Sequence, residues 1–248
     1  MSTDDRAARA ASFDRGAGAY AAARPSYPDD AVRWSVPSDA HDVLDLAAGT
    51  GKLTERLVAL GLHVIAVEPS DEMRAQLTAL LPDVEAYPGT AEHLDLPDAS
   101  VDAVTVAQAW HWVDAPAASA EIARVLRPGG QLAAIWNIRD DTVDWVAGWT
   151  EIVHRGDSLG DALHYDEPAL GKAFTTPEHA TFHWTQPMRT ADLRTLATSR
   201  SHLLLLPDAE RDALLDEIDQ LAATHPELRG RDVIEMPYRT ECYRARLR

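Results

Sequence analysis

The chain has 248 residues, of which 46% are hydrophobic, enough to build one large domain or two small ones around a buried core. Acidic residues outnumber basic ones by 40 to 23, and the formal net charge of −17 disfavours nucleic acids and anionic membranes as partners. Cys242 is the single cysteine, which excludes a disulfide within the chain and argues against a thiolate metal centre.

The N-terminal stretch MSTDDRAARAASFDR has no apolar segment of the kind that targets a protein for secretion, and no stretch has membrane-spanning length. We therefore expect a cytoplasmic protein. The histidines show no spacing typical of metal ligands, so we expect no metal site.

Strands and helices are predicted to alternate through the first half. A helix over residues 4–23 ends before Pro25, and a second covers 29–36. The following strands are predicted at 41–47, 63–69, 83–89, 100–109 and 131–137, separated by helices at 51–61, 70–82 (with Ser70 as N-cap) and 115–130. This rhythm predicts an α/β fold with a doubly wound, Rossmann-like, mostly parallel seven-stranded sheet and helices on both faces.

The second half has a different rhythm and shows no core pattern of its own. We expect helices at 141–155, 190–203 and 208–224, a strand at 179–188, and a last strand within 233–247. We interpret residues 1–248 as a single domain, with N-terminal lid helices (1–36), a ligand-binding core (41–137), and a helical cap with the last strands (138–248).

The stretch VLDLAAGTGKLT (43–54) places glycines between a strand and a helix, where the backbone can approach a ligand closely. Leu53 follows the Gly-Lys pair where a phosphate-binding loop needs Ser or Thr, and Thr54 stands where a dinucleotide loop has its third glycine. Asp45 would repel a pyrophosphate but attract an ammonium group, and Glu68 can accept both hydroxyls of a ribose. A ligand with an ammonium, a ribose and no phosphate is S-adenosylmethionine.

With these residues the sequence resembles the class I S-adenosylmethionine-dependent methyltransferases, strongly over residues 13–140 and loosely beyond. Asp45, Gly49 and Gly51 match the D-x-G-x-G-x-G loop of that family. Ala47 replaces the first glycine, a change that the loop tolerates if φ is negative at that position.

The resemblance implies which residues bind the cofactor. Glu68 would bind the ribose, Met73 would pack on the adenine, and the Gln108 carbonyl would receive the methionine ammonium. In the segment 89–104, Ala91 would offer its amide to the adenine, and Glu92 would replace the aspartate that the family often has at Thr90. The full set is Tyr20, Arg24, Asp45, Ala47, Gly49, Gly51, Glu68, Pro69, Met73, Thr90, Ala91, Glu92 and Gln108.

The N-terminal FDRGAGAYAAARPSYP resembles the branch of small-molecule methyltransferases similar to trans-aconitate methyltransferase, in which a helix lies over the cofactor. Tyr20 and Arg24 are one helical turn apart, so Arg24 can pair with a carboxylate of cofactor or substrate beside the Tyr20 hydroxyl. The alternative is a surface arginine and a packing tyrosine.

The stretch AQAWHWVD (107–114) follows the fourth strand, beside the glycine loop. His111 is either a general base or a group that orients the loop. Trp110 or Trp112 would line the acceptor pocket, and we expect at least one of them in the core. Arg139 and Arg200, with Arg24, are candidate anion-binding residues for a carboxylate acceptor.

These observations predict methyl transfer from S-adenosylmethionine to a small molecule, at oxygen or nitrogen. Two alternatives remain open: an S-adenosylmethionine-binding sensor or accessory protein, and, less favoured, an NAD-dependent oxidoreductase. The oxidoreductase would need a third loop glycine and no acid at position 45.

Overall fold

The structure is a computed structural model that describes residues 25–157, 168–199 and 201–248. The helix predicted over residues 4–23 lies outside them. The described chain divides into two compact units. The sheet unit comprises residues 26–137, 168–182 and 240–248, and the helical unit comprises residue 25, 138–157, 183–199 and 201–239. The single-domain interpretation stays a prediction.

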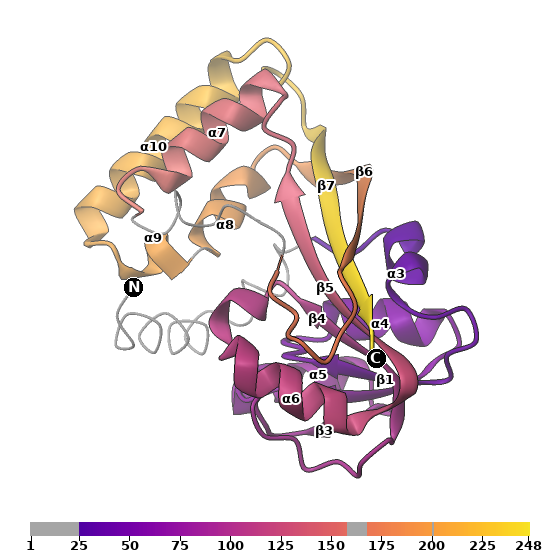
Figure 1. The fold of residues 1–248 in the computed structure, drawn as a ribbon. Coiled ribbons are helices and arrows are strands. Elements are labelled where there is room, and N and C mark those ends of the chain that lie inside the picture. Colours follow the sequence, from indigo (N-terminus) through magenta and orange to yellow (C-terminus); the bar gives the residue numbers. More distant parts are fainter. Residues whose placement is uncertain (1–24, 158–167, 200) are drawn as a thin grey trace. The chain divides into compact units, whose positions relative to one another are not determined.

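Seven strands form one sheet in the order β3-β2-β1-β4-β5-β7-β6 (Figure 1). Their bounds are β1 (Asp42–Leu46), β2 (His63–Val67), β3 (Glu85–Tyr87), β4 (Val101–Ala107), β5 (Leu126–Arg139), β6 (Glu178–Arg189) and β7 (Val233–Arg246). The pairings from β3 through β5 are parallel. Because the chain order reverses between β1 and β4, the switch point of a doubly wound sheet lies there. The predicted fold class is confirmed.

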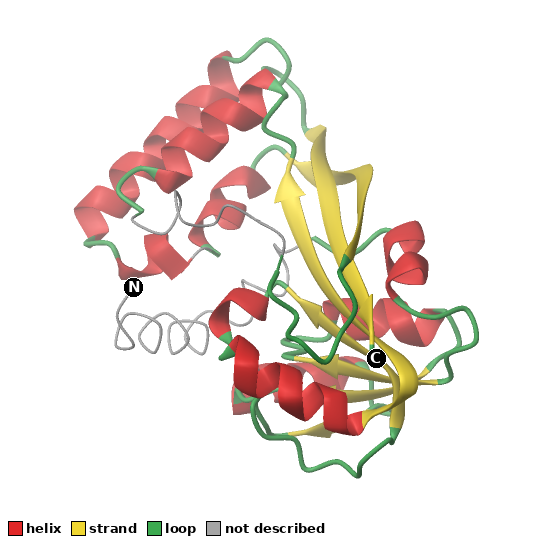
Figure 2. Cartoon of the chain, viewed as in Figure 1, coloured by secondary structure: helices red, strands yellow, loops and turns green. Residues whose placement is uncertain are grey.

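Helices cover the sheet unit on both sides. Figure 2 shows α6 (Ala115–Val125) in front of the strands and α4 (Lys52–Ala59) behind them. α3 (Asp29–Ser35) and α4 share a hydrophobic cluster with the sheet residues Val43 and Ile135. Apolar residues on one helical face and on the strands thus bury each other, the arrangement that the alternating pattern predicts.

Local signals set several helix boundaries. α5 (Asp71–Leu80) begins after Ser70, whose hydroxyl accepts a hydrogen bond from the Met73 amide, so the predicted N-cap is confirmed. Asp114 caps α6 in the same way through the Ala117 amide.

One helix prediction is wrong at its end. The helix expected over 115–130 stops at Val125, and residues from Leu126 onward belong to β5. Leu126 pairs with Val101, and the ladder shifts register before Gln131 pairs with Ala103. Pro128 cannot continue a helix, and this long-range pairing draws the residues around it into the strand.

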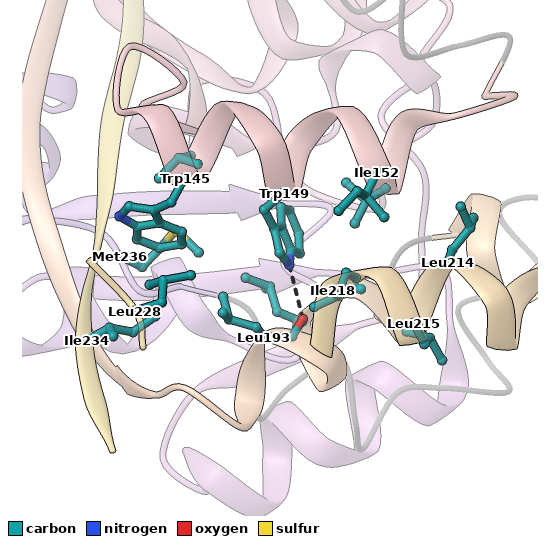
Figure 3. Close-up of a cluster of buried hydrophobic side chains, with 14 of the residues drawn as sticks. Trp145, Trp149, Ile152, Leu193, Leu214, Leu215, Ile218, Leu228, Ile234 and Met236 are labelled. Atoms are coloured by element: carbon teal, nitrogen blue, oxygen red, sulfur yellow. Dashed lines mark hydrogen bonds between the residues drawn. The ribbon is translucent and has the colours of Figure 1, made fainter. Parts of the chain in front are cut away.

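The helical unit has a hydrophobic cluster of its own, which the sequence pattern did not indicate (Figure 3). It joins α7 (Asp144–His154), α8 (Asp192–Thr198) and α10 (Asp208–Thr224) to residues of β7. Trp149 is fully buried in it and donates its indole N–H to the Leu193 carbonyl at 3.3 Å.

The remaining differences concern element lengths. The helix predicted over 190–203 is divided into α8 and α9 (Ser201–Leu205), whereas α10 has the predicted bounds. The strand predicted over 83–89 forms only at Glu85–Tyr87. In the part of the chain that the structure describes, every helix is too short or too polar to cross a membrane.

Candidate functional site

The loop between β1 and α4 turns tightly because three of its residues adopt left-handed backbone conformations: Ala47 (φ 56°), Gly49 (φ 57°) and Gly51 (φ 88°). The expectation that Ala47 has a negative φ is therefore wrong. A left-handed alanine costs roughly 1–2 kcal/mol, and the neighbouring Ala48 amide stabilises the turn by donating to the Val67 carbonyl at 3.1 Å.

The two glycines have different surroundings. A Cβ atom at Gly51 would lie 3.1 Å from Cγ of Leu77, so a side chain there would press on α5. A Cβ atom at Gly49 would meet only Sδ of Met73, at 3.9 Å. Gly51 therefore permits close packing of the loop on α5, and Gly49 leaves the loop backbone accessible beside Met73.

Asp45 lies on β1 directly before the loop and is 1% exposed. In the sheet it is the register partner of Ala66 on β2 and Thr105 on β4. Its carboxylate accepts hydrogen bonds from the Thr54 hydroxyl at 2.6 Å and the Thr105 hydroxyl at 3.2 Å. Burial raises the pKa of the Asp45 carboxyl to about 7, and the negative charge of Glu68 adds to the rise. A bound cation would favour the ionised form of this carboxyl.

Glu68 follows β2 and is 6% exposed. One of its oxygens accepts a hydrogen bond from the Gly49 amide at 2.8 Å, and the other accepts one from the Ser70 amide at 2.9 Å. Each carboxylate oxygen has two lone pairs, so one oxygen can accept more than one hydrogen bond. Glu68 therefore connects the glycine loop, through Gly49, to the N-cap of α5, through Ser70. Pro69 lies between Glu68 and this N-cap.

The segment after β3 has its own set of contacts. Thr90 pairs with His93 in an isolated bridge, and Ala91 is 5% exposed. The Glu92 carboxylate accepts a hydrogen bond from the Asp114 amide at 2.8 Å, at the N-cap of α6. Arg124 holds the rest of the segment by donating to the carbonyls of Leu94 and Leu96. Arg124 therefore has a structural role in this segment.

The residues after β4 are held by the end of β5. Gln108 adopts a positive φ of 58°, its amide donates to the Ile135 carbonyl at 2.8 Å, and its Nε2 donates to the Asn137 carbonyl at 3.0 Å. The short helix η1 (Trp110–Trp112) follows. The Trp136 indole N–H donates to Nδ1 of His111 at 3.4 Å.

The two tryptophans of η1 differ in exposure. Trp110 is 5% exposed, so the expectation of a core tryptophan is confirmed. Trp112 is half-buried and packs against the His111 ring, with centroids 4.7 Å apart.

The remaining predicted residues are in other places. Arg139 belongs to the helical unit, where its guanidinium stacks over the buried Trp149 ring at 4.4 Å. Tyr20, Arg24 and Arg200 lie outside the described residues.

Asn137 is a residue that the sequence reasoning missed. Its Nδ2 donates to the Ser26 carbonyl at 2.7 Å, and its Oδ1 accepts from the Thr240 hydroxyl at 2.6 Å. The signal available was a single amide at the end of the apolar strand QLAAIWN. Asn137 thus joins β5, β7 and the start of the described chain.

The residues around the loop fit a cationic, ribose-containing ligand. Asp45 and Glu68 bring two buried carboxylates to the carboxyl ends of adjacent strands, where a pyrophosphate would be repelled. Thr50, 5% exposed in the loop, has a buried hydroxyl without a hydrogen-bond partner among the described residues, so a ligand atom could supply one. No group of three or more metal-ligating side chains is present in the described ranges.

Comparisons with known proteins agree with this geometry. Residues 44–134 match the family model described as a methyltransferase domain. An uncharacterized methyltransferase of Mycobacterium bovis is 48% identical over 237 residues, which cover 95% of this chain and 96% of that protein.

Solved structures have the same fold. A putative type II methyltransferase from Anaeromyxobacter dehalogenans is 26% identical, with a TM-score of 0.60, over 90% of this chain and 96% of that one. Phosphoethanolamine N-methyltransferase 2 of Haemonchus contortus, solved with S-adenosylhomocysteine, is 17% identical, with a TM-score of 0.57, over 100% of this chain and 60% of that one. The chain belongs to the class I methyltransferases, and its cofactor is S-adenosylmethionine.

Proposed function

We propose that the chain transfers a methyl group to a small-molecule acceptor at oxygen or nitrogen, with carboxylic acids as the first class to test. The observation that carries the proposal is the pair of buried carboxylates, Asp45 and Glu68, at the ends of strands beside the segment that bears His111. When bound, S-adenosylmethionine supplies a methyl group on a positively charged sulfur.

We assign the cofactor's parts by charge and hydrogen-bonding capacity. Glu68, beside Pro69, would accept the ribose hydroxyls, and Asp45 and the Gln108 carbonyl would offset the methionine ammonium. The loop residues Ala47, Gly49 and Gly51 would approach the cofactor through their backbone.

The adenine would lie against Met73 and the segment that begins at Thr90. Met73 is buried, and the Ala91 amide is suited to a ring nitrogen of the adenine. The Glu92 carboxylate, which already accepts from Asp114, would receive the adenine amino group on its remaining lone pairs.

We place the acceptor near His111, with the half-buried Trp112 as an aromatic surface. From the sequence alone, Arg139 and Arg200 stay candidates for binding an anionic substrate. The FDRGAGAYAAARPSYP segment supports the branch similar to trans-aconitate methyltransferase, with Tyr20 and Arg24 over the cofactor.

The proposal extends to partners and location. The net charge of −17 supports a protein that binds neither nucleic acid nor anionic membranes. We propose a cytoplasmic, single-domain enzyme.

A screen of carboxylic acids, phenols and amines with S-adenosylmethionine labelled in its methyl group tests this function. We expect label in at least one small acid. Label only in protein or nucleic acid added to the assay would contradict a small-molecule acceptor.

A further inference from the structure

The end of β5 fixes the orientation of the His111 ring. Trp136 is 4% exposed, and its indole meets the Tyr243 ring edge-on at a centroid distance of 6.0 Å and an angle of 79°. Its Nε1–H donates to His111 Nδ1 at 3.4 Å. The His111 ring also packs on Trp112. Trp136 and Trp112 therefore both contact the imidazole, one through a hydrogen bond and the other through its ring.

This hydrogen bond determines which ring nitrogen carries the proton. An indole N–H can only donate, so Nδ1 of His111 must present its lone pair. A neutral imidazole has a single N–H, which is then at Nε2. A base acting through Nε2 would need the opposite tautomer, and its Nδ1–H would face the N–H of Trp136.

We propose that His111 is a hydrogen-bond donor, through Nε2–H, to an acceptor that arrives as an oxygen anion, with carboxylates as its chemical class. It is not a general base. This inference rests on the proposed function and narrows it. An amine or a neutral alcohol has a proton to lose and would need a base, whereas a carboxylate has none and offers lone pairs to a donor.

The reaction balances without a base. The carboxylate oxygen forms a new C–O bond to the methyl carbon with its own electron pair. The pair of the breaking C–S bond stays on sulfur, which becomes a neutral thioether. The anion and the sulfonium give a neutral ester and a neutral thioether, and no proton is released.

The tautomer can be measured without activity. A long-range nitrogen–proton NMR spectrum of the ¹⁵N-histidine-labelled protein reports which nitrogen of each neutral ring is protonated. The His111 signals are those absent from His111→Gln. We expect the Nε2–H form, and we expect Trp136→Phe to allow the other tautomer. An Nδ1–H form in the wild-type protein would overturn the proposal.

Two substitutions separate the donor from the base. The Gln side chain can present an N–H near the position of Nε2 but cannot take up a proton, whereas Leu provides neither. With carboxylic acids as acceptors, we expect His111→Leu to lower kcat/KM about 10- to 100-fold and His111→Gln to recover most of it. Equal loss in both variants, or labelling of amines alone, would contradict the donor role.

A measurement of cofactor binding distinguishes a failure of the donor proposal for His111 from a failure of the proposed methyl transfer. We expect the wild-type protein and both His111 variants to bind S-adenosylhomocysteine equally in calorimetry. A wild-type protein that fails to bind it contradicts the proposed function, whatever the tautomer. If no acid, phenol or amine is methylated, the tautomer of His111 measured by NMR decides whether the donor proposal stands.

Discussion

Replacing Asp45 with Asn removes a buried charge while keeping the size of the side chain. The carboxylate is 1% exposed and accepts hydrogen bonds from the Thr54 and Thr105 hydroxyls. An amide can accept from one hydroxyl and donate to the other. The variant therefore tests the charge of Asp45 with little change in packing.

The pKa of Asp45 determines whether its carboxyl raises or lowers the free energy of unfolding. Burial raises this pKa from 3.8 to about 7, so the folded protein holds the proton more tightly than the unfolded chain. The carboxyl's effect is absent below pH 3.8, and the free energy of unfolding falls as the pH rises from there to about 7. At 1.36 kcal/mol per pH unit, the ionised carboxyl costs roughly 4 kcal/mol at pH 8.

Asp45→Asn lacks this penalty. We expect the cofactor-free variant to be more stable than the wild type at pH 8, by up to about 4 kcal/mol, and nearly equal to it at pH 4. Urea unfolding at pH 4, 6 and 8 measures the difference. The same variant should bind S-adenosylmethionine more weakly, because the methionine ammonium loses an anionic partner. Equal stability of the two proteins at pH 8 would refute the reasoning.

Three further predictions use contrasting residues. The hydrogen bond from His41, with those from Arg127 and His63, lowers the pKa of Asp42 to about 2, so this carboxyl stabilises the fold above pH 3.8 and the stabilisation is lost as the pH falls toward 2. Asp42→Asn should therefore lower the free energy of unfolding in urea by about 1–2 kcal/mol at pH 7, after allowance for solvent screening. A loss of the same size at pH 2 would be inconsistent with this. Gly51→Ala should lower both stability and the affinity for S-adenosylhomocysteine measured by calorimetry. Gly61 also has a positive φ, 82°, but a Cβ atom added there would have no atom within 4 Å, so Gly61→Ala should lower stability alone. Unchanged cofactor affinity in Gly51→Ala would count against the loop assignment. Trp149→Phe should cost about 1–3 kcal/mol in denaturant unfolding, because it opens a cavity and removes the indole donor to the Leu193 carbonyl. A neutral effect would show that this cluster does not stabilise the fold.

The parts of the fold that follow from local pattern were predictable. The helix at 208–224 and the cap at Ser70 depend on residues within a few positions of one another. Asp45 and Glu68 followed from the rule that ligands bind at the carboxyl ends of parallel strands.

The features that the sequence did not indicate depend on contacts between residues that are far apart in the chain. Leu126 belongs to a strand because Val101, far away in the chain, pairs with it. The partners of Asn137 are Ser26 and Thr240, which no periodicity relates to it. The donor to His111 Nδ1 comes from another strand, so spacing alone could not choose between a base and a positioning group.

Calorimetric titration with S-adenosylhomocysteine, in the wild type and two matched variants, tests the central claim most directly. Glu68→Gln changes the carboxylate assigned to the ribose, and Glu72→Gln makes the same change at an exposed position on α5. We predict that Glu68→Gln lowers the affinity at least about 10-fold, as for the loss of a hydrogen bond to a charged group, while Glu72→Gln leaves it unchanged. Equal affinities in all three proteins would contradict the account of this site.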